Sequence, residues 1–584
     1  MSDLITLSLF FYEKELARIG FIATAASDPT SPEYSKHLSR EQLDELVELP
    51  AGERAMLAEW LTGHGMTVLK APETGKQVMF VHATMEQLES ALGADSLRWL
   101  IHYGGPRGAS AGSVLPRRFA GYVKKMRGIP GEPSRFGIER LGLPPLTDMF
   151  LPAISSSGEP AAMPADFGGM TPADIRDIYS FPADGTLNGS GETIALMMLG
   201  GRLDRNDLNA FWRAHRIEPP NVEIEMVATV SDAEPHPLHQ MEAGMTVEWA
   251  GAMAPGAKIV VYAIDPALIP DPWAAFLHAV INDKRNRPTI ACTSWITPER
   301  RYYAQNGHAV VTGLLTQAAA LGITVVSAAG DWGAFDGIPQ TIRDGRHVSD
   351  APWCHGVFPA VEDQVLGVGG TMITTRHPLT ETGWSGPPPP QMSKTLHFER
   401  IAGSGGFSDD VPVPAWQRPV MRGWYSRGPN TPAVVPYGRG FPDVALMAAG
   451  AAIQRSPGEA LSSQGFQALI GGRWIDYAGG TSVGAPIWAA IIALCNQARR
   501  AAGLGRCGFI NPLLYKLHEA QPPAFRNIST GTANVSMDVV NSRGRAATYE
   551  LPGYDCASGW NPVTGLGVPI VTNLIYHACR RESQ

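Results

Sequence analysis

The chain has few cysteines and few charged residues for its length. Its 584 residues include six scattered cysteines without a Cys-x-x-Cys pair. Such a pattern argues against a disulfide framework and against a cysteine zinc cluster. Cys292 and Cys495 lie in apolar runs and are expected to be buried, unreactive thiols. Charged residues make up 17% and the formal net charge is -8, so the basic surface expected of a nucleic-acid-binding protein is missing.

Long hydrophobic runs are also missing. No segment reaches the roughly 18 apolar residues of a membrane span, and the N-terminus lacks the pattern of a secretory signal. No membrane association is therefore predicted. Glycine (63) and proline (48) are plentiful and indicate many turns and long loops. With 44% hydrophobic residues, the chain can form two or three domains with sizeable cores.

Composition and periodicity divide the chain into three parts. Residues 1–103 mix strand and helix patterns, which predicts a small α+β domain. Residues 104–168 are rich in Gly, Pro, Ser and Ala and are predicted to be a linker with one helix over 115–126. In residues 169–584 strands and helices alternate, which predicts a parallel sheet with helices on both faces. The strands expected there are 193–199, 258–263, 289–295 and 324–328, and the helices are 204–213, 238–253, 273–282 and 309–321.

A glycine turn before an apolar helix carries the first candidate catalytic residue. Gly479-Gly480-Thr481-Ser482 precedes an apolar run from Ile487 to Leu494. This places Ser482 at a helix N-terminus, where unpaired N–H groups and the helix dipole favour negative charge. That setting suits a nucleophile whose attack creates an oxyanion. The alternative is that Thr481 or Ser482 only caps the helix.

Two carboxylates are candidate partners of this serine. None of the 15 histidines lies in the His-Gly-Thr sequence of subtilisin-type enzymes. On the expected helix 238–253, Glu242 and Thr246 are four residues apart and share one face. A carboxylate base suits acidic pH, where a histidine is protonated. Asp331 lies in the loop directly after the expected strand 324–328, and if kept protonated it could donate to an oxyanion; the alternative is a turn-forming aspartate.

In this order, the motifs resemble those of the sedolisins, serine-carboxyl peptidases of subtilisin-like α/β fold. The resemblance implies that 1–103 is a ferredoxin-like propeptide domain, that 104–168 contains the processing region and that 169–584 is the peptidase domain. It further implies an acid-acting zymogen, expected to be a monomer, with a polypeptide substrate and its propeptide as intramolecular inhibitor and chaperone. The matching motifs are Asp28-Pro29-x-Ser31-Pro32-x-Tyr34-x-Lys36-His37-Leu38, Trp60-Leu61-x-x-His64-Gly65, Thr171-Pro172, Tyr179-x-Phe181-Pro182, Val368-Gly369-Gly370-Thr371, Gly405-Gly406-Phe407-Ser408, Pro442-Asp443-Val444, Gly480-Thr481-Ser482 and Gly559-Trp560-Asn561-Pro562-x-Thr564-Gly565-Leu566-Gly567.

Carried over by position, the resemblance makes Ser482 the nucleophile that forms an acyl-enzyme, Glu242 the general base and Asp331 the oxyanion-stabilising acid. Thr246 stands where the family carries an aspartate that holds and tunes the glutamate. A threonine can orient Glu242 by a hydrogen bond but cannot share a proton with it. Disabling the orienting acid of a serine triad costs on the order of 10⁴ in turnover. A weakened or inactive enzyme is therefore expected.

The resemblance also implies a calcium site in the segment 520–570. Asparagines replace its two aspartates, and calcium affinity follows ligand charge, so weak binding or none is expected, with the loop closed by hydrogen bonds. Met198 is another departure, since active members often carry a glutamate there; its usual companion Trp295 remains. The calcium-site positions are Asn527 and Asn561 for side chains and Ile528, Ala557 and Gly559 for backbone carbonyls.

Several interpretations stay open at this point. Beside the peptidase stands a non-catalytic pseudopeptidase that binds peptides or a protein partner, favoured by the four substitutions at the two sites. A third is an intracellular acyl-transfer enzyme on the same scaffold, based on the missing signal peptide. The resemblance implies secretion, and a cytoplasmic location is the alternative. His239 and His236 could supply a substitute base or bind zinc; otherwise they are exposed loop histidines.

Overall fold

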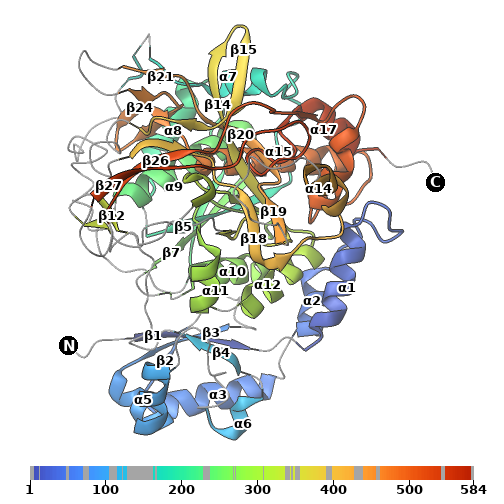
Figure 1. The fold of residues 1–584 in the computed structure, drawn as a ribbon. Helices are drawn as coiled ribbons and strands as arrows, with labels where there is room; N and C mark the ends of the chain where they lie inside the picture. Colours follow the sequence, from blue (N-terminus) through green and yellow to red (C-terminus); the bar gives the residue numbers. More distant parts are fainter. Residues whose placement is uncertain are drawn as a thin grey trace.

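The structure is a computed structural model of the 584-residue chain, shown in Figure 1. Most of the expected linker, the expected processing region and His236 lie outside the described residues. The structure describes all residues except 1–4, 12–13, 48–50, 70–77, 104–114, 122, 128–161, 165–166, 201, 228–236, 267–268, 270, 307, 336–341, 344–345, 349–355, 390–397, 426–437, 455–460, 541–545 and 581–584.

The first domain is a four-stranded antiparallel sheet in the order β2-β3-β1-β4. Strands β1 and β3 at its centre, with helices between β1 and β2 and between β3 and β4, make the domain ferredoxin-like. Its strands are β1 (Ile5–Phe11), β2 (Thr67–Val68), β3 (Val78–Ala83) and β4 (Val123–Arg127), and its helices are α1 (Leu16–Ser27), α2 (Arg40–Val47), α3 (Ala51–Gly63), α4 (Met85–Leu92), α5 (Ala94–Tyr103) and α6 (Arg117–Ala120).

Two expectations for this region are corrected by the position of β4. The helix expected over 115–126 is instead the short helix α6 followed by a strand. Because β4 pairs with β1, the first domain continues to at least Arg127, beyond the boundary expected at residue 103. The sequence signal was misleading because Val123–Arg127 has no periodic pattern of its own, and its place in the sheet depends on a partner more than 100 residues away.

The second domain is built on one large sheet with parallel neighbours in the order β20-β14-β10-β8-β5-β7-β6, to which β15 adds an antiparallel edge. The eight expected helices and strands are present with ends shifted by only one or two residues. Its strands are β5 (Thr193–Leu199), β6 (Val222–Met226), β7 (Lys258–Ile264), β8 (Ile290–Thr293), β10 (Thr324–Ala328), β14 (Val365–Arg376), β15 (Leu379–Gly383) and β20 (Val444–Ala449).

Helices cover both faces of this sheet, as Figure 1 shows. One group contains α9 and α15, and the other contains α10 and α12. The helices of the domain are α7 (Pro172–Ile178), α8 (Arg205–Ala214), α9 (Pro237–Met253), α10 (Pro272–Asn282), α11 (Glu299–Asn306), α12 (His308–Ala320), α14 (Arg418–Tyr425), α15 (Thr481–Ala501), α16 (Asn511–Lys516) and α17 (Val571–Ala578).

Smaller sheets and hairpins complete the second domain. The largest of them pairs segments from the middle and the end of the chain around β26. Their strands are β9 (Thr297–Pro298), β11 (Ile342–Arg343), β12 (Arg346–Val348), β13 (Val357–Phe358), β16 (Ser385–Gly386), β17 (Phe398–Ala402), β18 (Gly406–Pro412), β19 (Gly438–Phe441), β21 (Ala452–Ile453), β22 (Ser462–Ser463), β23 (Phe466–Ile470), β24 (Arg473–Ala478), β25 (Phe525–Arg526), β26 (Val535–Val540), β27 (Ala546–Leu551) and β28 (Val568–Pro569).

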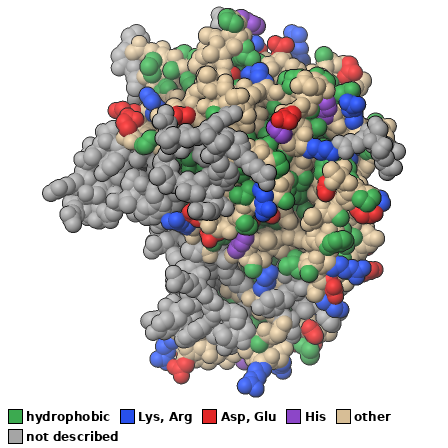
Figure 2. All heavy atoms as spheres, turned by 45° about the vertical axis from the view of Figure 1, so that its right-hand side comes forward, with side chains coloured by type: hydrophobic (Ala, Val, Ile, Leu, Met, Phe, Trp, Pro, Cys, Tyr) green, Lys and Arg blue, Asp and Glu red, His purple; other side chains and the backbone are tan. Residues whose placement is uncertain are grey.

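Helix α15 is the central element of the larger core. It packs against α9 and against β8, β10, β14 and β20. Its length and hydropathy would also suit a membrane span, but 83% of that apolar window is buried inside the protein, as in a core helix. Cys292 and Cys495 are fully buried, as expected. On the surface, Figure 2 shows Lys, Arg, Asp and Glu side chains interspersed over the visible face.

The sheet of the first domain is buried on both faces. Leu7 and Leu9 of β1 point into the domain's own core, whereas Phe10, on the opposite face, joins a core shared with α10 and α12. In Figure 1 this sheet lies directly beneath those helices. The second domain therefore supplies the cover for one face of the first, so the two domains are joined by a continuous apolar interface.

Polar contacts from the α1–α2 region add to this interface. Arg40 is 8% exposed and donates to the carbonyl oxygens of Val280, Ile281 and Pro288 at 3.0–3.3 Å. The first two carbonyls belong to the last turn of α10, where no intrahelical N–H is available. Arg40 thus caps a helix of the other domain. The N–H of Leu38 similarly donates to the carbonyl oxygen of Ala320, at the end of α12.

Two histidines at this interface are held in their neutral form. Burial lowers the pKa of His37 to about 4, and the nearby Arg506 and Arg499 cations also lower it. A hydrogen bond to the backbone of Arg506 raises the pKa in part. Burial lowers the pKa of His278 on α10 to about 3, with the Arg54 cation adding to the shift. In the described part of the chain, His37 Nδ1 and His278 Nε2 are buried without a hydrogen-bond partner.

Domain docking should therefore weaken as pH falls. A histidine freed by undocking titrates near 6.5, whereas the docked pKa values are about 4 and 3. Docking affinity is then fully present above about pH 6.5 and falls by up to tenfold per pH unit per histidine below it. Hydrogen exchange of α1 and α2 between pH 7 and 4, corrected for intrinsic rates, measures this in full-length Ser482→Ala, which blocks the self-cleavage that the resemblance implies.

Replacing both interface histidines by glutamine should flatten this pH dependence. His377→Gln, an exposed histidine on the β14–β15 hairpin, is the matched control and should behave like the parent. Docking that does not change with pH, or that changes equally in the double glutamine variant, would contradict the assignment.

Candidate active site

The N-terminus of α15 begins inside the protein rather than at the surface. Gly480 precedes the helix with φ +79°, a left-handed conformation that favours glycine, and a Cβ there would clash with the Asp331 carboxyl. No side chain of the N-cap residue satisfies the first N–H groups. The carboxylate of Asp331 does so instead, accepting from Thr481 N and Thr481 Oγ1, each at 2.9 Å. The expected glycine turn thus exists, and it brings Asp331 to the helix that carries Ser482.

Asp331 follows β10, where the sequence expected it, and leaves one carboxyl oxygen facing Gly480. Its loop is fixed by hydrogen bonds from Gly330 N to Thr481 Oγ1 and from Trp332 N to Ser404 Oγ, both at 3.0 Å. Burial raises the pKa of Asp331, and the two hydrogen bonds from Thr481 lower it in part. A carboxyl in these surroundings can hold a proton, as the oxyanion-stabilising role requires.

Glu242 and Thr246 lie on the face of α9 that meets α15. Burial raises the pKa of Glu242 to about 8, and the Asp331 charge adds to the increase. Interactions with the side chains of Ser482, Ser294 and Thr246 act in the opposite direction, so all three lie close to the Glu242 carboxyl. The structure therefore brings the predicted nucleophile, base and acid together.

The Glu242 carboxyl is nevertheless incompletely paired. Among the described residues, neither its Oε1 nor Thr246 Oγ1 makes a hydrogen bond of good geometry, although both atoms are buried. A threonine hydroxyl has one proton to donate and no charge. Thr246 is thus only a weak substitute for a second carboxyl that would pair with Glu242.

Ser294 was not among the residues expected in the site. It follows β8 as Asp331 follows β10, and it is 8% exposed. The carboxyl ends of neighbouring parallel strands meet at one edge of a sheet, which is the rule that selected Asp331. The same rule could have selected Ser294, but serine is common in turns, so the sequence alone gave no reason to choose it.

The interpretation of His239 as an exposed loop histidine is wrong. His239 is in the first turn of α9 and 6% exposed, and its ring packs edge-on against Trp295 with 5.0 Å between centroids. Within the described residues, no group of three His, Cys, Asp or Glu side chains is arranged to hold a metal ion. Met198 lies in the core of the second domain, 3% exposed.

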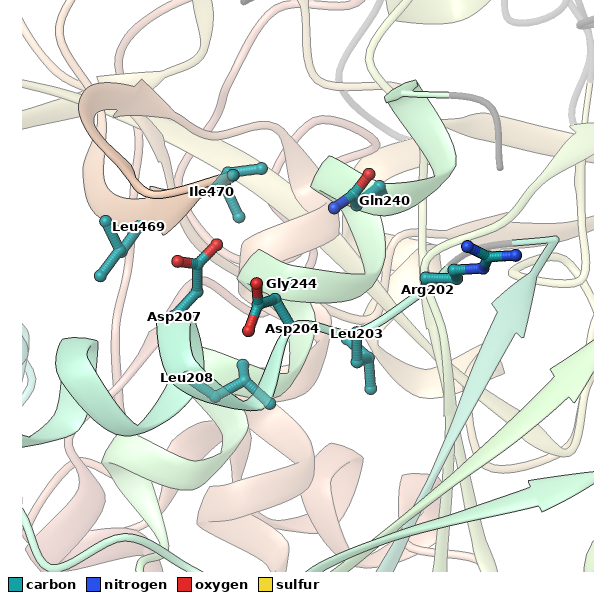
Figure 3. Close-up of a pocket in the computed structure, with 10 residues that line it drawn as sticks. Arg202, Leu203, Asp204, Asp207, Leu208, Gln240, Gly244, Leu469 and Ile470 are labelled. Carbon is teal, nitrogen blue, oxygen red and sulfur yellow. The ribbon is translucent and has the colours of Figure 1, made fainter. Parts of the chain in front are cut away.

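A small pocket lies beside α9, as Figure 3 shows. Gln240 and Gly244 face it, and they lie about 200° around the helix from Glu242. Its carboxylates have structural partners, since Asp204 caps α8 and Asp207 accepts from Gly472 N. The pocket is therefore separate from the candidate catalytic residues. It is lined by Arg202, Leu203, Asp204, Asp207, Leu208, Gln240, Gly244, Leu469, Ile470 and Gly471.

The five calcium-site positions come together, but their hydrogen bonds do not fit a cation. Asn561 Nδ2 donates to the carbonyl oxygens of Ile528 and Ala557 at 3.3 and 3.1 Å. Asn527 Nδ2 donates to the Gly559 carbonyl at 2.8 Å. The three carbonyls that would bind calcium are therefore already paired with amide N–H groups.

The orientation of the Asn561 amide is fixed by its other end. Its Oδ1 accepts from the backbone N–H groups of Val563 and Thr564, each at 3.0 Å. Turning the amide over would set Nδ2 against these two donors and Oδ1 against the carbonyl oxygens. The oxygen that a cation would need is thus committed elsewhere, and the residues present do not fit calcium.

Comparison with known proteins gives matches in both parts of the chain. Residues 2–130 match the family model of the pro-kumamolisin activation domain. The chain is 29% identical to kumamolisin of Bacillus sp. (strain MN-32), covering 95% of this chain and 88% of the relative. It is 26% identical to tripeptidyl-peptidase 1 of Bos taurus, covering 97% and 90%.

Among solved structures, Pseudomonas sedolisin, a serine-carboxyl proteinase complexed with two molecules of pseudo-iodotyrostatin, is similar with a TM-score of 0.52. The match has 21% identity and covers 70% of this chain and 98% of that chain. At this identity the likeness concerns the fold, and it agrees with the subtilisin-like α/β fold.

Gly480→Ala should lower the free energy of unfolding for two separable reasons. A left-handed backbone costs an alanine about 1–2 kcal/mol, and the new Cβ would also clash with the Asp331 carboxyl. Gly472→Ala is a matched control, because its φ is +74° and a Cβ there meets no atom within 4 Å. Urea unfolding should show a larger loss for Gly480→Ala than for the control.

The excess loss at Gly480 should disappear when the carboxyl is removed. In an Asp331→Ala background, Gly480→Ala is expected to cost about as much as Gly472→Ala does. An equal cost of Gly480→Ala in both backgrounds would show that Asp331 does not occupy the space beside the turn.

Proposed function

Because the chain belongs to the sedolisin family and carries its N-terminal activation domain, we propose that it is a serine-carboxyl peptidase zymogen in which Ser482 forms an acyl-enzyme. The observation that carries this proposal is the meeting of Ser482, Glu242 and Asp331 at the N-terminus of α15. The three residues come from three separate elements, so their convergence is a property of the fold.

The proposed reaction uses each group in one role. Glu242, when ionised, accepts the proton of Ser482 Oγ as that oxygen attacks the scissile carbonyl. The protonated Asp331 carboxyl donates to the oxyanion that develops, assisted by the N-terminus of α15. Glu242 then passes its proton to the leaving amine, and a water molecule hydrolyses the acyl-enzyme by the same route.

The surroundings of Glu242 set the proposed pH range. The base is active only when ionised, and its pKa is about 8, so the rate should rise as pH increases from 4. The rise should end where Asp331, whose pKa is also raised by burial, loses the proton that its role requires. This is a higher range than the acidic one that the resemblance implies. The physical reason lies at position 246, because two carboxyls that share a proton lose their first proton readily, whereas a threonine gives Glu242 no such partner.

One observation favours the alternative of an inactive pseudopeptidase that binds peptides or a protein partner. The base and the residue that should orient it, Glu242 and Thr246, both carry a buried oxygen without a good hydrogen bond. In that case the chain would bind a peptide or a protein partner without cutting it. Ser482→Ala would then leave the biological activity unchanged.

The first domain is proposed to act as the intramolecular inhibitor and folding partner. Its support is the continuous apolar interface and the Arg40 cap on α10. Polypeptide is the proposed substrate class, in line with the peptidase relatives. Secretion and a monomeric state stay predictions from the resemblance.

Intact-mass spectrometry tests catalysis directly. Wild type incubated at pH 4 and pH 7 should lose its N-terminal region, faster at pH 7, while Ser482→Ala keeps its full mass. Thr246→Asp should let the new carboxyl and Glu242 share a proton, which moves the acid limb of the pH–rate profile to lower pH. Processing at pH 4 should then be faster by up to about a hundredfold. Thr246→Asn, of similar size to the aspartate but without a carboxyl, is the control and should not speed processing.

The outcomes separate the two candidate functions. Processing of wild type that depends on Ser482 supports the peptidase. Unchanged mass in wild type together with cleavage in Thr246→Asp supports the pseudopeptidase. Unchanged mass in every variant, with no cleavage of unfolded protein, would overturn the assigned catalytic residues.

We further propose that the 520–570 segment works without calcium. Two asparagine side chains make the closing contacts in place of a cation. The melting temperature should be the same, within error, in EDTA and in about 5 mM calcium. Asn527→Asp/Asn561→Asp should lose the amide donors, become less stable in EDTA and regain stability with calcium. Asn206→Asp/Asn221→Asp, at two exposed asparagines outside this segment, is the charge-matched control.

A further inference from the structure

The carbonyl oxygen of Ser482 lacks its usual partner within α15. In an α-helix this oxygen accepts from the N–H four residues on, which here is Pro486. Proline has no N–H, and its ring crowds the carbonyl of the preceding turn. The peptide unit of the proposed nucleophile must therefore be fixed by a group outside the helix, or it is left unpaired.

Ser294 supplies that group. Its Oγ donates to the carbonyl oxygen of Ser482 at 3.0 Å. Ser294 is 8% exposed and directly follows β8, a strand whose residues are fully or nearly fully buried, so its backbone position is well determined. The bond replaces the one that Pro486 removes and ties the first turn of α15 to the edge of the central sheet.

The same hydroxyl is also close to the proposed base. The interaction of Ser294 with the Glu242 carboxyl is one of those that lower the pKa of that group. A serine hydroxyl has one proton and two lone pairs. With Glu242 protonated, Ser294 can accept from the carboxyl while donating to the Ser482 carbonyl; with Glu242 ionised, its proton can turn to the carboxylate.

We propose that Ser294 is a positioning residue that fixes the backbone of Ser482 and holds the Glu242 carboxyl beside it. It does not contact the scissile bond in this role. The effect on rate rests on the proposed function, whereas the hydrogen bond to Ser482 can be tested whether or not the chain is active.

The first experiment measures steady-state kinetics of processed enzyme against pH. Ser294→Ala should lower kcat on the order of tenfold with little change in KM, because substrate-binding groups are untouched. Loss of the hydroxyl also removes an interaction that lowers the Glu242 pKa, so the acid limb should move to higher pH. Ser294→Thr keeps the hydroxyl and should restore both kcat and the pH profile.

Ser463→Ala is the matched control. Ser463 is also buried, 6% exposed, and its Oγ donates to a backbone carbonyl, that of Pro387, at 2.6 Å. This variant can lose stability but should keep the pH profile of wild type. A wild-type kcat and pH profile in Ser294→Ala, or an equal shift in Ser463→Ala, would overturn the proposal.

A second experiment needs no turnover. Pro486→Ala returns an N–H to the helix, so the Ser482 carbonyl no longer depends on Ser294. In urea unfolding of the full-length chain, Ser294→Ala should be clearly destabilising with Pro486 present and much less so with alanine at 486. Equal losses in both backgrounds would overturn the positioning role. If wild type shows no turnover, the proposed function fails, and this cycle still decides the inference.

Discussion

The buried N-terminus of α15 is the constraint on which the rest of the site depends. A helix that begins at the surface can leave its first N–H groups to water, but this one begins against the ends of β8 and β10. Its unpaired groups need partners from the surrounding elements. Asp331 pairs with the N–H and hydroxyl of Thr481, and Ser294 pairs with the Ser482 carbonyl. Satisfying the backbone thus brings a carboxyl and a hydroxyl to the proposed nucleophile.

The same constraint explains the electrostatics of the site. Burial that allows a helix dipole to act on an oxyanion also removes water from the carboxyls nearby. The pKa values of both Glu242 and Asp331 are raised for that reason. For Asp331 the shift serves its proposed role, which needs a proton. For Glu242 the raised pKa works against its proposed role as a base, which must be ionised. Thr246 has no carboxyl that could lower this pKa by sharing a proton.

Periodic patterns predicted the second domain well because its strands and helices are locally consistent. The strand at 193–199 is almost wholly apolar, as a strand buried on both faces must be, and the helix at 238–253 is mostly buried, with a few polar residues on it. Glu242, Asp331 and Ser482 could be selected from motifs that follow or lie within such elements. What the sequence could not show depends on distant partners: β4 is recognised only through its pairing with β1. Ser294 is recognised only through the carbonyl that Pro486 leaves unpaired.

At two sites this chain has a neutral side chain where the resemblance implies a carboxylate, with different physical consequences. At position 561 the implied aspartate would face carbonyl oxygens across a cation, whereas the amide of Asn561 donates to the same oxygens directly. The replacement is complete because only hydrogen-bond complementarity is required. At Thr246 the partner is itself an acid, and the function needed is a shared proton, which a hydroxyl of high pKa cannot provide. Asparagine side chains can therefore close the first site without a cation, whereas at the second site the proposed mechanism requires a proton-sharing group that threonine cannot supply.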